Sequence, residues 1–87
     1  MNRERILAVI ADFLEKRGKL PNNRNELLNY KYLEVGHIDS FGMVQLIMTI
    51  EDEFGIELQQ ENLEDVELVS TVRGLVDLVE MRIKQKR

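Results

Sequence analysis

The chain has 87 residues, of which 44% are apolar and 32% are charged, and this is the composition of one globular domain rather than of a disordered chain. It contains no cysteine, which excludes a disulfide framework and a thiolate metal site, so any thiol chemistry has to come from an attached group. No apolar run is long enough to span a membrane. We therefore expect a monomeric protein in the cytoplasm.

The charge is unevenly divided along the chain, although its net value is only −4. No lysine or arginine lies between Lys31 and Arg73, and residues 32–72 carry ten acidic side chains. The rest of the chain has twelve basic and six acidic residues. Such a field repels nucleic acid from the central segment and attracts basic protein surfaces to it. We expect basic protein partners and no nucleic acid; an acidic face that only aids solubility is the alternative.

The N-terminal half is predicted to contain one long helix and a long connection. Apolar spacing indicates a helix from about Arg3 to Arg17, with Gly18 as its stop. Its core face consists of Ile6, Val9, Ile10, Phe13 and Leu14. Residues 18–37 connect this helix to the next, with a short helical turn within 25–33. A connection of this length in a small domain is either packed by its own side chains or functional.

The C-terminal half is predicted to contain two long helices and a short one. The first runs from Ser40 to Phe54 and Gly55, and a short acidic helix lies within residues 59–68, with Leu63 and Val66 facing inward. Ser70 or Thr71 caps the last helix, whose core positions are Val72, Leu75, Val76, Val79 and Ile83. Three main helices and a minor one predict an all-α bundle that forms a single domain over residues 1–87.

The helix that follows Ser40 has more apolar side chains than burial on one side requires. The stripe expected to face the core consists of Met43, Leu46, Ile47, Ile50 and Phe54. A second row with an acidic edge consists of Phe41, Val44, Met48, Glu51 and Asp52, and its members at four-residue spacing form a column below the serine. Either this helix is buried on all sides, or the second row is a docking surface for a partner.

Asp39 and Ser40 stand where a helix start needs side chains that accept hydrogen bonds from free backbone N–H groups. Capping alone explains an arbitrary Asp-Ser pair at such a position. The serine could instead be a site of covalent modification, and the pair by itself does not decide between these roles.

Taken together, these features resemble the acyl carrier protein family, which consists of phosphopantetheine attachment domains. The matching residues are Gly36, Asp39, Ser40, Val44, Leu46, Glu51, Phe54 and Ile56, and the order of helices agrees over most of the chain. The resemblance implies that Ser40 carries 4'-phosphopantetheine, which a separate magnesium-dependent phosphopantetheinyl transferase takes from coenzyme A. It implies that Asp39 takes part in the encounter with that transferase, and that the thiol of the arm holds an acyl or aminoacyl group as a thioester.

The resemblance also implies a free-standing carrier with no catalytic activity of its own. Its partners would be acyl- or aminoacyl-activating and transferring enzymes with basic docking surfaces. The commonest fatty-acid-synthesis version has a leucine and an acidic residue after the serine, and a glutamate at the position of Gln45. Here Phe41 and Gly42 follow the serine, and the string DSFGMVQL looks more like D-alanyl carrier proteins and other carriers of specialised pathways. Gly42 also weakens the first helical turn by about 0.5–1 kcal/mol relative to alanine.

Two other kinds of protein compete with the carrier. One is an acidic helical interaction module in which Ser40 is only a helix cap. The other is an enzyme, but the only histidine, His37, has no cysteine or second histidine with which to bind a metal, and no oxyanion-hole motif accompanies Ser40. We expect His37 to be an ordinary surface loop residue, and we expect no metal site.

Overall fold

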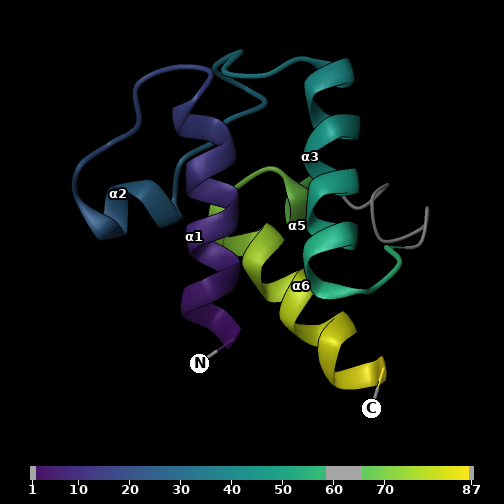
Figure 1. Ribbon diagram of the computed structural model, residues 1–87. Helices are drawn as coiled ribbons and strands as arrows, with labels where there is room; N and C mark the ends of the chain where they lie inside the picture. Colours follow the sequence, from purple (N-terminus) through teal and green to yellow (C-terminus); the bar gives the residue numbers. More distant parts are fainter. Residues whose placement is uncertain (1, 59–65, 87) are drawn as a thin grey trace.

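The computed structural model describes residues 2–58 and 66–86, and these residues form helices and connections without any strand. The helices are α1 (Asn2–Glu15), α2 (Arg24–Leu28), α3 (Ser40–Phe54), α5 (Val66–Val69) and α6 (Val72–Lys86). α1 packs against both α3 and α6, and α5 and α2 also contact α6 (Figure 1). The predicted all-α bundle is confirmed. No helix in the described ranges is both long enough and apolar enough to cross a membrane.

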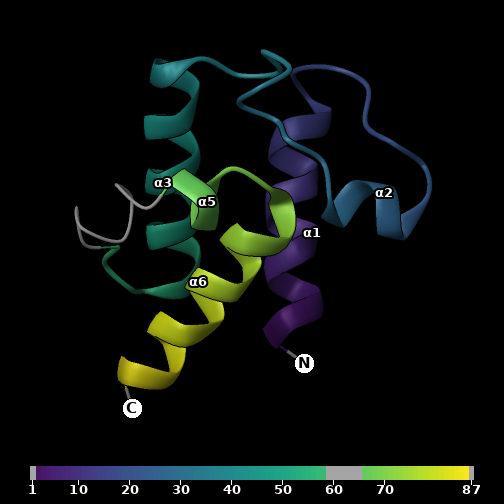
Figure 2. The same cartoon turned by 180° about the vertical axis from the view of Figure 1, so that it is seen from behind.

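The end of α1 and the start of α3 lie at the same end of the bundle. Figures 1 and 2 show α1 and α3 running in opposite directions, so that α3 starts at the end of the bundle where α1 ends. The first turn of α1 and the last turn of α6 lie at the other end. The helix that begins at Ser40 therefore starts far from both ends of the described chain.

The apolar stripes predicted from helical spacing form one core. The fully buried side chains include Ile6, Ile10, Leu14, Leu46, Ile50, Val72, Leu75, Val76 and Val79. Leu7 and Leu78 are also buried, although the sequence analysis did not select them, whereas Val9 is half-buried. Apart from Tyr32, which carries a hydroxyl, no residue with a polar or charged side chain is buried in the part of the chain that the structure describes. Apolar burial is therefore the main source of stability in this bundle.

Helix ends follow the predictions at α3 and depart from them at α1. α3 covers the predicted residues, and Gly55 ends it in the left-handed conformation, with a φ of 63°. α1 ends at Glu15 rather than at Arg17, and Gly18 does not have a positive φ, so it is not the predicted left-handed stop. Instead Gly18 makes room for the ring of His37, because a Cβ on it would stand 3.2 Å from the imidazole Cε1.

The connection between α1 and α3 is held by its own side chains, as its leucines and tyrosines suggested. It contains α2, whose first N–H groups are capped by the side chain of Asn23. Tyr32 is fully buried and its hydroxyl donates a hydrogen bond to the carbonyl of Val69, while burial raises the pKa of its phenol. The N–H of Val72 donates to the carbonyl of Tyr30 at 3.2 Å. These bonds tie the connection to the junction between α5 and α6.

The segment before α6 is only partly described. The predicted short helix within 59–68, with Leu63 facing inward, lies mainly outside the described residues, and α5 is the part that can be seen. Thr71 provides the predicted cap of α6, because its Oγ1 accepts a hydrogen bond from the N–H of Gly74 at 3.0 Å. Ser70 is not the cap; its hydroxyl donates to the carbonyl of Glu67.

Replacing Gly74 with alanine should destabilise the bundle. A Cβ at this position would lie 1.9 Å from the carbonyl oxygen of Leu68, a backbone atom that cannot rotate away. We expect Gly74→Ala to lower the free energy of unfolding by about 1–3 kcal/mol in urea denaturation. Arg73→Ala, at the exposed neighbouring position, should change it by less than about 0.5 kcal/mol. Equal stabilities of the two variants would contradict the close approach of α5 and α6.

Candidate functional site

Asp39 and Ser40 have different roles at the start of α3. Asp39 has an extended backbone, and its carboxylate accepts a hydrogen bond from the N–H of Gly42 at 2.8 Å, which makes it the N-cap. Ser40 is the first helical residue; it is exposed, and its hydroxyl has no hydrogen-bonding partner among the residues that the structure describes. The capping predicted for the pair therefore belongs to Asp39, and the hydroxyl of Ser40 is accessible for chemistry.

Gly42 has a packing role that the sequence did not reveal. It is buried in the first turn of α3, and a Cβ on it would lie 2.9 Å from the Cβ of Ile38. Ile38 is itself a buried core residue. The glycine thus allows the residue before the cap to enter the core, which offsets the helix propensity lost at this position.

His37 is not the ordinary surface residue that the sequence analysis expected. Its ring is half-buried, with Nδ1 2.7 Å from the hydroxyl oxygen of Tyr30 and Nε2 2.7 Å from the carbonyl oxygen of Leu14. Because a carbonyl can only accept, Nε2 carries a proton and donates, and in the neutral ring Nδ1 accepts from Tyr30. Both nitrogens are engaged in holding the connection against α1, so His37 does not serve as a base for Ser40.

The second apolar row of α3 is exposed. Phe41, Val44 and Met48 are 70%, 55% and 59% exposed, which rules out the interpretation that α3 is buried on all sides. Val35, in the connection before α3, is exposed by 59% and was not selected from the sequence, because a residue in a loop belongs to no helical period. The three side chains on α3 follow one another at helical spacing, and such a group of exposed apolar side chains marks a contact surface more often than scattered ones do.

An apolar groove of about 470 Å³ runs beside this row. It is lined by Leu33, Met43, Val44, Ile47, Met48, Glu51, Leu58 and Val69. Val44 and Met48 therefore border both the open face and the groove. The sequence did not predict the groove, because its walls come from separate segments of the chain that only the folded bundle brings together.

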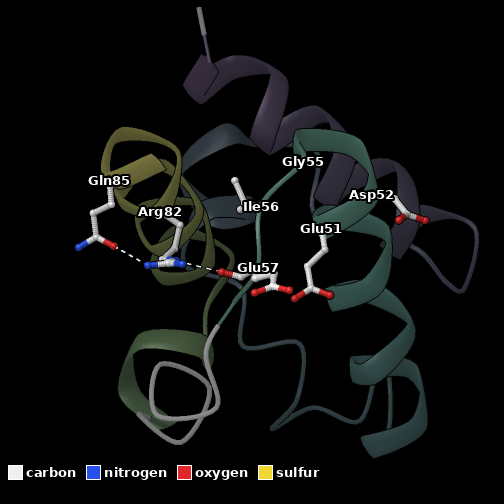
Figure 3. Close-up of a pocket in the computed structure, with 7 residues that line it drawn as sticks. All are labelled: Glu51, Asp52, Gly55, Ile56, Glu57, Arg82 and Gln85. Carbon is white, nitrogen blue, oxygen red and sulfur yellow. Dashed lines mark hydrogen bonds between the residues drawn. The ribbon is translucent and has the colours of Figure 1, made fainter. Parts of the chain in front are cut away.

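The predicted acidic edge is divided between two environments. Glu51 is half-buried, and its carboxylate accepts a hydrogen bond from the N–H of Leu58 at 2.9 Å, whereas Asp52 is exposed. Figure 3 shows Glu51 turned towards Glu57, with Asp52 pointing away from them. Glu51 therefore supports the turn after α3, and Asp52 is the more accessible charge.

These acids border a cavity of about 510 Å³ at the far end of α3 from Ser40 (Figure 3). On its opposite wall the Nε of Arg82 donates to the carbonyl of Glu57 at 2.9 Å, and its Nη1 donates to the side-chain oxygen of Gln85 at 2.7 Å. Within residues 2–58 and 66–86, no group of three or more histidine or acidic side chains is placed to hold a metal ion.

A helical bundle that presents an exposed, unbonded serine beside an exposed apolar helix face has the form of a carrier domain. Comparison with known families assigns the class: residues 4–79 match the phosphopantetheine attachment site family. The chain belongs to this family, whose members hold 4'-phosphopantetheine on a serine and are carriers without catalytic activity of their own.

Three curated proteins that are 24–29% identical to this chain are acyl carrier proteins. The chain is 26% identical over 77 residues to acyl carrier protein 5, chloroplastic, of Arabidopsis thaliana, an alignment that covers 88% of this chain and 52% of the relative. It is 29% identical over 83 residues to acyl carrier protein 1, chloroplastic, of Casuarina glauca, covering 95% and 55%. A third relative, from Brassica napus, is 24% identical over 78 residues, covering 90% and 55%. The chain thus spans about half the length of these relatives.

The division of roles between Asp39 and Ser40 can be tested by stability. Removing the cap in Asp39→Ala leaves the N–H of Gly42 without its partner, and we expect a loss of about 0.5–2 kcal/mol in urea denaturation. Ser40→Ala is the matched control and should change the free energy of unfolding by less than about 0.5 kcal/mol. A larger loss for Ser40→Ala than for Asp39→Ala would show that the serine is the cap.

Proposed function

We propose that Ser40 is the residue to which 4'-phosphopantetheine is attached, with Asp39 beside it as part of the transferase recognition site. The observation that carries this proposal is the exposed serine hydroxyl at a helix start that another residue already caps. A phosphodiester on Ser40 would lie where backbone N–H groups and the helix dipole favour negative charge. The only other serine, Ser70, is half-buried and its hydroxyl is bonded to the Glu67 carbonyl.

The proposed carrier works in the cytoplasm. Its arm would supply the only thiol, since the chain has no cysteine, and this thiol would hold the cargo as a thioester. A phosphopantetheinyl transferase would load the arm, and acyl- or aminoacyl-activating and transferring enzymes would use it. The residues Phe41, Gly42 and Gln45, which depart from the commonest fatty-acid-synthesis version, support a specialised biosynthetic pathway.

The docking surface of this carrier would be the exposed row of α3. Phe41, Val44 and Met48 supply apolar contact area next to Ser40, and Asp52 and Glu51 supply negative charge further along the helix. A partner with a basic rim and an apolar centre fits this pattern. The charges would steer the encounter, and the apolar side chains would provide most of the affinity.

The attachment is tested by intact mass. The protein is incubated with coenzyme A, magnesium and a broad-specificity phosphopantetheinyl transferase, and we expect it to gain one phosphopantetheine group. Ser40→Ala should gain none, whereas Ser70→Ala, the matched control at the second serine, should be modified like the wild type. If the wild type gains no mass, the carrier proposal fails and the acidic interaction module takes its place.

The steering role of the acids is tested by salt. The KM for the same transferase should rise with ionic strength, because exposed charges are screened. Asp52→Asn should raise the KM by about two- to fivefold at low salt and flatten its salt dependence. Glu26→Gln, which removes an exposed charge on α2, should have no such effect. A KM that does not respond to salt would instead identify the apolar row as the determinant, and Phe41→Ala should then raise it at every salt concentration.

A further inference from the structure

Arg17 follows the end of α1, and its positive charge lies against α3. Its Nη1 donates a hydrogen bond to the carbonyl of Phe13 at 3.1 Å, and its Nη2 lies 3.4 Å from the side-chain oxygen of Gln45 in α3. The guanidinium also stacks over the ring of Phe13, with 3.7 Å between its Cζ and the ring centroid. Contacts with both helices thus hold this cation in place beside the second turn of α3.

The charge of Arg17 is not matched by a carboxylate. Three other arginines form ion pairs: Arg3 with Asp77 and Glu80, Arg5 with Glu53, and Arg24 with Glu4. Among the described residues Arg17 forms no ion pair, although an arginine offers five N–H donors. Its environment therefore leaves donors and charge available to a group from outside.

The side chain of Arg17 borders a hollow next to Ser40. A cavity of about 290 Å³ is bordered by Arg17, Asp39, Phe41 and Gln45, together with residues 36–38 and 42. Asp39 also lies on this wall, but its carboxylate caps α3 through the N–H of Gly42. The cavity opens beside Phe41, the most exposed of the large apolar side chains in the described residues.

An enzyme that covers Phe41 will also cover this cavity and remove water from the guanidinium. A desolvated cation without a partner opposes binding, whereas a carboxylate in the fork of an arginine compensates the lost water with paired hydrogen bonds. We propose that Arg17 is a specificity determinant, and that the enzymes acting on Ser40 place an acidic side chain in this cavity. This inference rests on the proposed function.

The proposal changes the expected partner surface. A partner that were basic throughout would meet Arg17 with like charge at the Ser40 end of α3, where it has to come closest. The proposed partner is acidic opposite Arg17 and basic opposite Asp52. Its surface charge therefore changes sign from one end of α3 to the other. Such a pattern fixes which way round the partner sits on the helix.

The test measures kcat/KM for phosphopantetheine transfer from coenzyme A by the same transferase at low ionic strength. Arg17→Gln should lower kcat/KM several-fold, and Arg17→Glu should lower it by roughly tenfold or more, because a paired charge is lost and then reversed. Lys16→Glu is the matched control: it makes the same change of net charge one residue away, at an exposed lysine that pairs with Asp12 at 3.3 Å. It should stay within about twofold of the wild type.

Circular dichroism and thermal unfolding establish that each variant is folded. If Arg17→Glu is destabilised by its new proximity to Asp39, Arg17→Gln carries the test, because it removes the positive charge without placing a negative one beside Asp39. Transfer to both Arg17 variants at or above the wild-type rate would overturn the inference. So would a change in the Arg17 Nε–H chemical shift on attachment of the arm without any effect of Arg17 on kcat/KM, since the arm itself would then occupy the cavity. Absence of transfer to the wild type would count against Ser40 as the attachment residue, whereas transfer that is independent of Arg17 counts only against this inference.

Discussion

Hydrogen bonds from the connection between α1 and α3 hold the start of α3 in place. Tyr32 and Tyr30 bind the junction of α5 and α6, and His37 links the last turn of α1 to Tyr30. The connection is long, and its backbone would cost much conformational entropy to order without such anchors. Because it is tied to helices on two sides, Ser40 stands at a fixed junction although a loop leads to it.

The face that follows Ser40 combines features that belong to different parts of the sequence. Its apolar residues and Asp52 come from α3 itself. The positive charge of Arg17, at the border of the face next to Ser40, comes from the basic N-terminal segment. The division of charge along the chain, acidic in the middle and basic outside, is therefore not preserved as a division of surfaces. The fold sets Arg17, just after the end of α1, against the acidic helix, and this makes the two ends of the face electrostatically different.

The sequence predicted what depends on local periodicity and local chemistry. The limits of α3, its core stripe and the cap of α6 follow from helical spacing, from Gly55 and from Thr71, all of which act within a few residues. It also predicted that Phe41, Val44 and Met48 form a second row, but it could not determine whether another segment covers them. That depends on which neighbours α3 has, and the bundle leaves this row open.

Features made by segments far apart in the sequence were missed. The groove beside Val44, the cavity beneath Arg17 and the bond from Tyr32 to Val69 each require the crossing of separate elements. His37 was misjudged for the same reason, since nothing near it in the sequence indicates that the carbonyl of Leu14 lies within reach. The end of α1 was placed two residues too late because Gly18 was interpreted as a helix stop, whereas it makes space for the His37 ring.

The contact between Gly42 and Ile38 links two positions that would otherwise vary independently. The commonest fatty-acid-synthesis carriers have an acidic residue where this chain has Gly42, and any such residue would place its Cβ 2.9 Å from that of Ile38. Every side chain except glycine has this Cβ, so a shorter residue at position 38 would not remove the close contact, and a change towards that pattern requires the backbone that leads into α3 to move. Replacing Gly42 alone therefore passes through a clash, so an attempt to redesign this carrier for other partners has to begin with the path of the backbone between Ile38 and Gly42.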